Sequence, residues 1–156
     1  MSKEFRELPK ESRLGDAQTA DFGDHVLDVY KLIDLAKDLD VLEIDIPPVE
    51  NFKDDACWND ENGKKLKPYE IVQEYINKPD IYSIIEKHPE WRKHIEKIME
   101  ANYEDIPIIL IDDQVMDGMH RLTRAWIDGV EKVKAKKFEH LSEEKLKQLE
   151  YEKAKE

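Results

Sequence analysis

Cysteine is almost absent from this chain, with Cys57 the single example among 156 residues. One thiol cannot form an internal disulfide, and such usage fits a protein of the reducing cytosol. Cys57 lies in the acidic stretch D-D-A-C-W-N-D-E, and neighbouring carboxylates raise the pKa of a thiol and so disfavour the reactive thiolate. We therefore expect Cys57 to be a partly buried residue beside Trp58 and not a nucleophile.

Long apolar runs are also missing. No stretch approaches the roughly 20 apolar residues that span a bilayer. The first residues, M-S-K-E-F-R-E-L-P-K-E, lack the apolar segment of a signal peptide. The sequence thus predicts a cytoplasmic protein that makes no use of a membrane.

The chain has fewer basic than acidic residues. Lysine and arginine total 25 against 37 aspartates and glutamates, which gives a net charge of −12. Nucleic-acid affinity depends mostly on Lys and Arg that neutralise phosphates, so this balance argues against DNA as a partner. A small anionic ligand in one local basic pocket remains compatible with it.

The hydrophobic pattern predicts one small α+β domain, a mixed β-sheet with flanking helices. Asp24 is the expected N-cap of a helix over 25–39. Residues 119–128 have helical spacing and end at Gly129, a typical C′ residue. Strand patterns cover 41–46, 108–111 and 133–138.

The predicted organisation has three parts. Residues 1–22 are polar and aperiodic, and we expect a flexible N-terminal arm. Residues 23–140 form the domain, with a helical insert at about 68–101. Residues 141–156 form a charged C-terminal helix with few apolar residues, which either docks weakly or contacts a protein partner. Within the polar stretch 51–67, Trp58 is expected to fold back onto the core, with ligand stacking as the alternative.

The motif D-G-M-H-R contains the side chains best suited to binding or catalysis, and it lies where a strand pattern is followed by a helical pattern. The first N–H groups of a helix have no internal partners and carry partial positive charge, so they bind anions. Gly118 permits a tight turn and close approach of a ligand. Arg121 could clamp two phosphate oxygens, and Arg124, one turn later, could add charge or pair with Asp128.

The two remaining polar residues of this motif suggest acid–base or metal chemistry. His120 could donate to a phosphate or transfer a proton, and Asp117 could hold a metal ion or orient His120. A structural role is equally open, in which Asp117 caps the helix and Arg121 pairs with an acidic residue.

Weaker candidates lie elsewhere. Glu43 is on the polar face of the first strand and could act as a base or metal ligand, although a solvated face is the commoner case. His94, with Glu90 and Lys97 as helical neighbours, could reach the site, although a histidine at the helix surface is the commoner case. The five histidines have no H-E-x-x-H spacing, which argues against zinc.

The stretch I-I-L-I-D-D-Q-V-M-D-G-M-H-R-L-T-R-A-W-I-D-G-V-E-K-V-K-A-K-K-F, residues 108–138, resembles the central signature of the ParB/sulfiredoxin superfamily. There a strand hairpin leads to Gly-x-His/Arg-Arg at a helix start, and a further strand follows. Residues 41–46 match the family's first strand more loosely, so the resemblance covers about half of the chain.

This resemblance implies a nucleotide-binding protein. ParB-type members bind and hydrolyse CTP, sulfiredoxin uses Gly-Cys-His-Arg with ATP and magnesium, and the free serine kinases use Asp-Gly-x-His-Arg to phosphorylate a small molecule. The form D-G-M-H-R is closest to the kinases. Carried over, Gly118, His120 and Arg121 would bind phosphate, with Met119 in the same loop. If the ligand brings magnesium, Asp117 or Glu43 would bind the ion.

Two differences from the family pattern reduce the number of possible functions. Met119 stands where sulfiredoxin has its nucleophilic cysteine, which excludes sulfinic-acid reduction by that route. Only residues 141–156 follow the signature, too few for the DNA-binding module of ParB.

Three hypotheses follow. The first is a nucleotide- or phosphate-binding protein that acts as a magnesium-dependent phosphotransferase or NTP hydrolase on a small molecule, with ATP or CTP as cofactor. The second is a non-enzymatic acidic protein that binds a regulatory partner. The third is a ParB-like nuclease, which the net charge disfavours and a local strip over Lys134–Lys137 favours.

Overall fold

The computed structural model describes residues 19–151. Within this range the chain forms two units. Unit 1 contains residues 19–42, 107–118 and 135–151, and unit 2 contains residues 43–106 and 119–134. Both units combine segments that are distant in the sequence.

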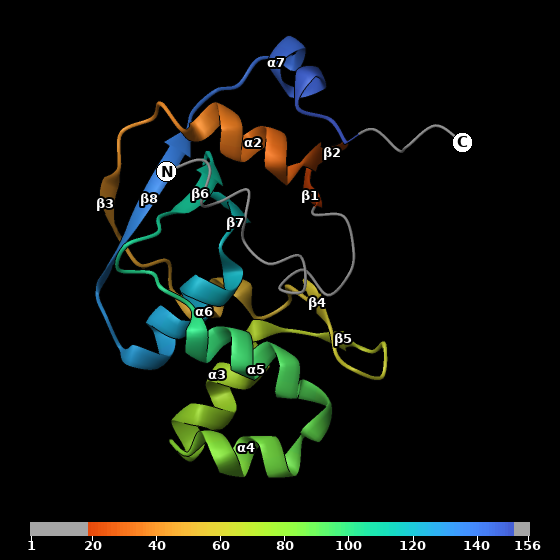
Figure 1. The fold of residues 1–156 in the computed structure, drawn as a ribbon, viewed down its shortest axis with the longest axis vertical. Helices are drawn as coiled ribbons and strands as arrows, with labels where there is room; N and C mark the ends of the chain where they lie inside the picture. Colours follow the sequence, from red (N-terminus) through yellow and green to blue (C-terminus); the bar gives the residue numbers. More distant parts are fainter. Residues whose placement is uncertain (1–18, 152–156) are drawn as a thin grey trace. The chain divides into compact units, whose positions relative to one another are not determined.

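Unit 1 is built on short strands (Figure 1). Strands β1 (Thr19–Phe22) and β2 (His25–Asp28) form an antiparallel hairpin. Strand β6 (Ile108–Ile111) pairs antiparallel with β7 (Gln114–Asp117) and parallel with the second half of β8 (Lys132–Phe138). All four residues of β6 are buried, as expected of a central strand with neighbours on both sides.

Two helices complete unit 1. Helix α2 (Val29–Ala36) begins at Asp28, whose carboxylate accepts from the backbone of Tyr30 and Lys31. Helix α7 (Glu143–Gln148) follows β8. One apolar core joins these helices to β2, β6, β7 and β8; its buried members are Leu27, Val29, Leu32, Ile33, Ala36, Ile109, Ile111, Met116, Phe138, Leu146 and Leu149.

The segment after α7 lies along β2 in unit 1. Glu150 bridges Leu27, and the Tyr151 N–H donates to the Val26 carbonyl over 2.8 Å. His25 adds a side-chain clamp, with Nδ1 2.7 Å from Glu150 and Nε2 3.0 Å from Glu143. Both partners are carboxylates, so Glu150 first and Glu143 second raise the pKa of His25.

Three predictions for unit 1 need correction. The predicted arm was drawn through Phe22, but Thr19–Phe22 is strand β1; residues 1–18 lie outside the described range. The N-cap of α2 is Asp28, not Asp24, because the residues before it pair as β2. The C-terminal helix ends at Gln148, and its apolar residues Leu146 and Leu149 are 3% and 4% exposed, so they belong to the core of unit 1.

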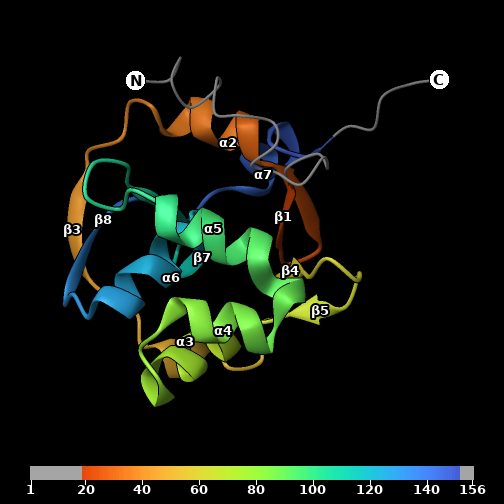
Figure 2. The same ribbon diagram turned by 60° about the horizontal axis from the view of Figure 1, so that its bottom comes forward.

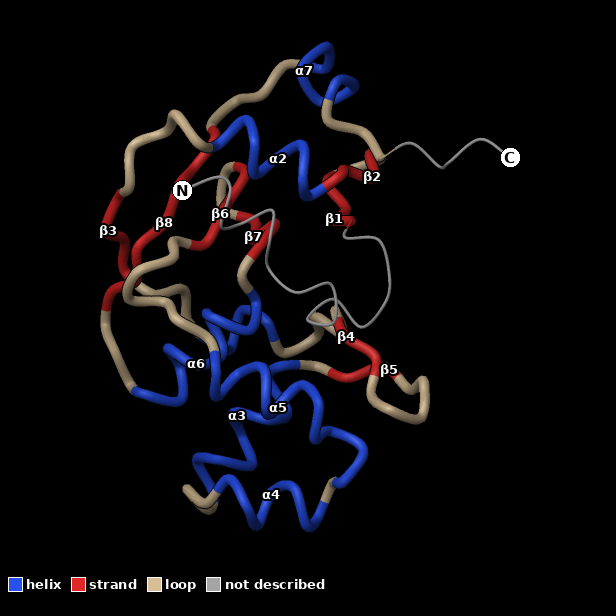
Figure 3. The backbone as a smooth tube through the Cα atoms, viewed as in Figure 1, coloured by secondary structure: helices blue, strands red, loops and turns tan. Residues whose placement is uncertain are grey.

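Unit 2 is mainly helical (Figures 2 and 3). Its helices are α3 (Pro68–Asn77), α4 (Ile81–Lys87), α5 (Arg92–Glu100) and α6 (Met119–Asp128), with 3-10 turns at Val49–Phe52 (η2) and Pro89–Trp91 (η3). Helices α3, α4 and α5 lie within the predicted helical insert. Helix α6 packs on α3 and α5, and a core centred on Trp58, Ile71, Ile95 and Ile98 fills the space between helices.

Unit 2 also contains three strand segments. Strand β3 (Leu42–Asp45), apart from its first residue, belongs here and is a neighbour of β8. Strands β4 (Trp58–Asn59) and β5 (Lys65–Leu66) form a small hairpin. Together with β6 and β7 the order is β3-β8-β6-β7, a mixed sheet, which confirms the α+β fold class predicted from the sequence.

No helix among residues 19–151 combines the length and the apolar character needed to span a bilayer.

Candidate active site

Gly118 connects β7 to α6 in a backbone conformation that L residues avoid, with φ +108°. A Cβ at this position would lie 2.7 Å from Cγ2 of Ile108 and 3.2 Å from its Cα. The sequence suggested that glycine here admits a ligand. The side chain of Ile108 instead occupies this space, so Gly118 is required by packing within unit 1 and by its φ angle.

His120, the second residue of α6, is joined to two groups of unit 2 by hydrogen bonds in series. Its Nε2 is 2.9 Å from Nδ1 of His94 on α5, and Nε2 of His94 is 2.7 Å from the Asn59 carbonyl oxygen on β4. His94 is 2% exposed and His120 is half-buried. This chain of hydrogen bonds, His120–His94–Asn59, is called the imidazole relay below.

The relay fixes the position of each proton. A carbonyl oxygen only accepts, so His94 must donate from Nε2 to Asn59. The Nδ1 of a neutral His94 is then an acceptor, and His120 must donate to it from Nε2. A neutral His120 consequently carries its free lone pair on Nδ1, and within residues 19–151 that nitrogen makes no hydrogen bond.

Trp58 covers both imidazoles with its indole ring. Its ring centroid is 4.6 Å from that of His94 and 4.3 Å from that of His120, with interplanar angles of 8° and 11°. The two imidazole centroids are 5.2 Å apart at 10° while their facing nitrogens are 2.9 Å apart, so these rings meet edge to edge in nearly one plane. Trp58 is 9% exposed, which agrees with the prediction that it folds onto the core.

The surroundings disfavour the protonated form of both imidazoles. Burial lowers the pKa of His94. Burial also lowers the pKa of His120 well below its usual range, and the charges of Lys97 and Arg121 act in the same direction. The two cations therefore lie near enough to His120 to create a positive local potential, although the whole protein is acidic.

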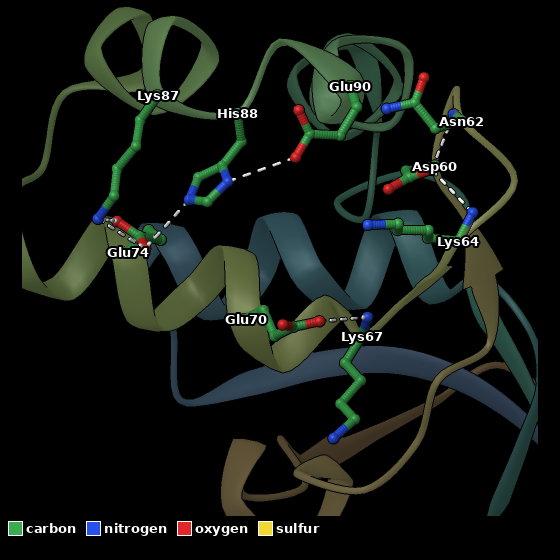
Figure 4. A network of polar contacts seen from close by, with 9 residues as sticks. All are labelled: Asp60, Asn62, Lys64, Lys67, Glu70, Glu74, Lys87, His88 and Glu90. Atoms are coloured by element: carbon green, nitrogen blue, oxygen red, sulfur yellow. Dashed lines mark hydrogen bonds and ion pairs between the residues drawn. The ribbon is translucent and has the colours of Figure 1, made fainter.

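The β4–β5 turn holds the Asn59 carbonyl in place (Figure 4). The Asp60 carboxylate accepts from the backbone N–H groups of Asn62 and Lys64, over 2.8 and 2.9 Å. The Glu61 N–H donates to the Glu90 carbonyl in η3, and the Glu61 carboxylate accepts from the Lys93 N–H in the first turn of α5. These bonds fix β4 against the helix that carries His94, so the acceptor of the relay is part of a rigid turn.

A second stacked histidine lies in the same unit (Figure 4). His88 is stacked on Trp91 with centroids 3.8 Å apart and planes at 9°. Its nitrogens are 3.4 Å from Glu74 and 3.5 Å from Glu90. His88 thus contacts carboxylates on both sides and is a natural control for His120, whose partner is a neutral imidazole.

The other residues of D-G-M-H-R and the following turn are engaged in packing or ion pairs. Arg121 is 9% exposed, and its Nη1 lies 3.4 Å from the Ile106 carbonyl. Arg124 forms an ion pair with Asp128, which was one of its two predicted roles. It also donates a hydrogen bond to the Met99 carbonyl. Met119 packs against the core of unit 2. The charge of Arg121 acts on His120, and Arg124 is held by Asp128 and Met99.

The predicted carboxylates are on two different strands. Asp117 is the last residue of β7 and belongs to unit 1. Glu43 is exposed on β3, where its charge acts on Lys132. Among residues 19–151, no three His, Cys, Asp or Glu side chains form a group that could hold a metal ion. A magnesium ion would therefore need Asp117 alone and oxygen atoms of its ligand, as Mg²⁺ often does in nucleotide sites.

His94, Trp58 and Lys97 were missed as site residues in the sequence. One signal was present: His94 falls three residues after Trp91 and four before Ile98, within the buried stripe of α5. A polar residue in that stripe needs a buried partner. The partner itself could not be foreseen, because β4 is only two residues long.

The expected partial burial of Cys57 is wrong, because the residue is exposed in the structure. Its low reactivity agrees with the prediction, since desolvation of the thiol by surrounding atoms raises its pKa to about 12 and the charge of Asp55 contributes in the same direction. No family model matches this chain, and neither the curated proteins nor the solved structures contain a match.

Proposed function

We propose that this protein binds a small phosphorylated ligand, a nucleoside triphosphate in the first instance, at the His120 end of α6 and transfers or hydrolyses its phosphoryl group. The observation that carries the proposal is the imidazole relay. It presents one uncharged nitrogen with a defined lone pair beside two cationic side chains, Lys97 and Arg121.

The relay supplies what phosphoryl transfer needs from a protein, namely positioning and charge stabilisation. The positive end of α6 and the two cations favour a polyanion. A neutral imidazole does not compete with the ligand for those cations, and it offers a lone pair to the phosphoryl group or its acceptor. The resemblance of residues 108–138 to nucleotide-binding proteins of the ParB/sulfiredoxin superfamily supports the same ligand class.

A nuclease is less well supported. Two lysines of the Lys134–Lys137 strip are used within unit 1: Lys136 donates to the carbonyls of Ala36 and Lys37, and Lys137 pairs with Asp113 over 3.0 Å. Few free cations remain on that strip for a phosphate backbone, and the net charge of −12 opposes its approach.

Calorimetry and thermal unfolding with ATP, CTP, GTP and ADP, each with and without magnesium, test this proposal. A ligand at 100 times its Kd should stabilise the fold by about 2.7 kcal/mol. His120→Gln should weaken binding or abolish turnover, and His88→Gln, the stacked control, should behave as the wild type. The proposal fails if no nucleotide stabilises the wild-type protein.

A further inference from the structure

The relay has an open end and a closed end. At the closed end the Asn59 carbonyl accepts a proton that it cannot take away, because a carbonyl oxygen does not titrate near neutral pH. At the open end Nδ1 of His120 makes no hydrogen bond within residues 19–151, and the residue as a whole is half-buried. Between them, Nδ1 of His94 is 2.9 Å from Nε2 of His120, so it can receive the proton that His120 holds there.

We propose that His120 is a nucleophile that takes the terminal phosphoryl group of a nucleoside triphosphate on Nδ1, with His94 as the acceptor of its Nε2 proton. The inference rests on the proposed function, since it requires a phosphorylated ligand at this site. It replaces direct transfer by two steps through a phosphohistidine.

In the first step the Nδ1 lone pair forms the N–P bond. The P–O bond to the leaving diphosphate breaks, and its electron pair goes to the leaving oxygen. The ring would become cationic, so its Nε2 proton moves to Nδ1 of His94. In the second step water or an acceptor hydroxyl attacks phosphorus and releases its own proton to solvent. The N–P electron pair returns to Nδ1, and His94 returns its proton to Nε2.

The surroundings favour a nucleophile over a general base. A general base works best with a pKa near the operating pH, whereas burial and the nearby cations lower the pKa of His120 well below its usual range. The same lowering keeps the nucleophilic neutral form populated. The titratable or charged groups that act on His120 are His94, Lys97 and Arg121, and their positive charge also stabilises the phosphoryl group once it is attached.

Trp58 favours this proton transfer because its indole ring keeps His94, the proton acceptor, in the plane of His120. The indole is stacked over both rings at 4.6 and 4.3 Å, and this stacking favours the shared plane of the two imidazoles. The proton path between His120 and His94 therefore stays short in each step. His94 acts through His120 and is a positioning residue, not a catalytic one.

The test is a rapid-quench experiment on the full chain with γ-³²P-labelled ATP and magnesium, stopped in alkali. A phosphohistidine survives alkali and is lost in acid, and mass spectrometry of the wild-type digest should place it on His120. The labelling rate should be flat from about pH 6 to pH 8, because the neutral imidazole predominates throughout. His120→Gln should not label, and His88→Gln should label as the wild type.

His94→Gln separates the role of His94 from a purely structural one. We expect its labelling rate to fall roughly 10²-fold, in the range of a positioned acid–base group, with ATP affinity by calorimetry unchanged and circular dichroism like that of the wild type. An unchanged labelling rate overturns the role of His94.

The outcomes also separate this inference from the proposed function. If the wild type binds ATP and forms ADP without a base-stable label at any quench time, the phosphohistidine is refuted and the proposed function stands. A label on any residue other than His120 also refutes it. If ATP, CTP and GTP all fail to bind, both proposals fall together.

Discussion

Replacing Gly118 by alanine should destabilise unit 1 strongly, for two separable reasons. The first is backbone strain, because φ is +108° and a non-glycine residue in a sparsely populated region costs about 1–3 kcal/mol. The second is a clash: the new Cβ would lie 2.7 Å from Cγ2 and 3.2 Å from Cα of Ile108. Ile108 is fully buried on the central strand β6, so it cannot move aside, and such overpacking costs about 1–3 kcal/mol.

The sum is a loss of about 2–6 kcal/mol, which is a large part of the ~5–15 kcal/mol stability of a typical domain. Gly63 provides the matched control, since its φ is +81° and a Cβ there would meet nothing within 4 Å. Gly63→Ala should show the strain alone, about 1–3 kcal/mol.

Urea unfolding of the two variants, followed by circular dichroism, measures this difference. The clash at Gly118 predicts that Gly118→Ala is less stable than Gly63→Ala by about 1–3 kcal/mol. Equal losses would refute the packing explanation and reopen the view that the glycine serves a ligand. Nucleotide affinity of the folded Gly118→Ala fraction would then decide between them.

Four further outcomes are expected. The pKa of His25 is raised above its ordinary value of 6.5, so protonated His25 stabilises the fold fully below that pH, and this stabilisation is lost as the pH rises through the folded pKa. The free energy of unfolding measured in urea should therefore fall across that pH range. His25→Gln should remove this pH dependence. Trp58→Leu should raise the pKa of His120 toward its usual value by admitting water, which proton NMR titration of the ring measures. Leu146→Ala, at a site 3% exposed, should cost about 2–4 kcal/mol in urea unfolding; a loss under 1 kcal/mol would mean that α7 does not dock as described. Asp28→Ala should cost about 1 kcal/mol through the lost cap of α2, and Asp24→Ala, at the cap expected from sequence, should cost less in the same assay.

The regular elements with strong local signals could be predicted from the sequence. Helix α6 spans Met119–Asp128 as its spacing and Gly129 indicated, and Gly129 has the positive φ of a C′ glycine. Strand β6 was predicted from the short apolar run that precedes a turn. In these segments local propensity and tertiary environment agree.

The hairpin β1–β2 was missed because its local pattern is ambiguous. Val26 and Val29 have helical spacing, yet Val26 is 47% exposed while Leu27 is fully buried, which is the alternation of a strand. Pairing with β1 and the bridge from Leu27 to Glu150 both hold residues 25–28 extended. The distant partner leaves no trace in a local window, and tertiary context overrides propensity.

The sequence named His120 as a candidate residue but did not identify its hydrogen-bond partner. That partner, His94, was expected at a surface and is 2% exposed. A single histidine in an amphipathic helix does not reveal the carbonyl that it meets, since Asn59 reaches it through a two-residue strand and a turn.

The pairing of β2 with the segment after α7 has a consequence for biosynthesis. Lys31 and Glu150, which are in contact, are separated by 119 positions. On the ribosome, the apolar side of α2 is therefore made early and waits without Leu146 and Leu149 until nearly all described residues have emerged. The core of unit 1 therefore cannot be completed cotranslationally until the last described residues have been made.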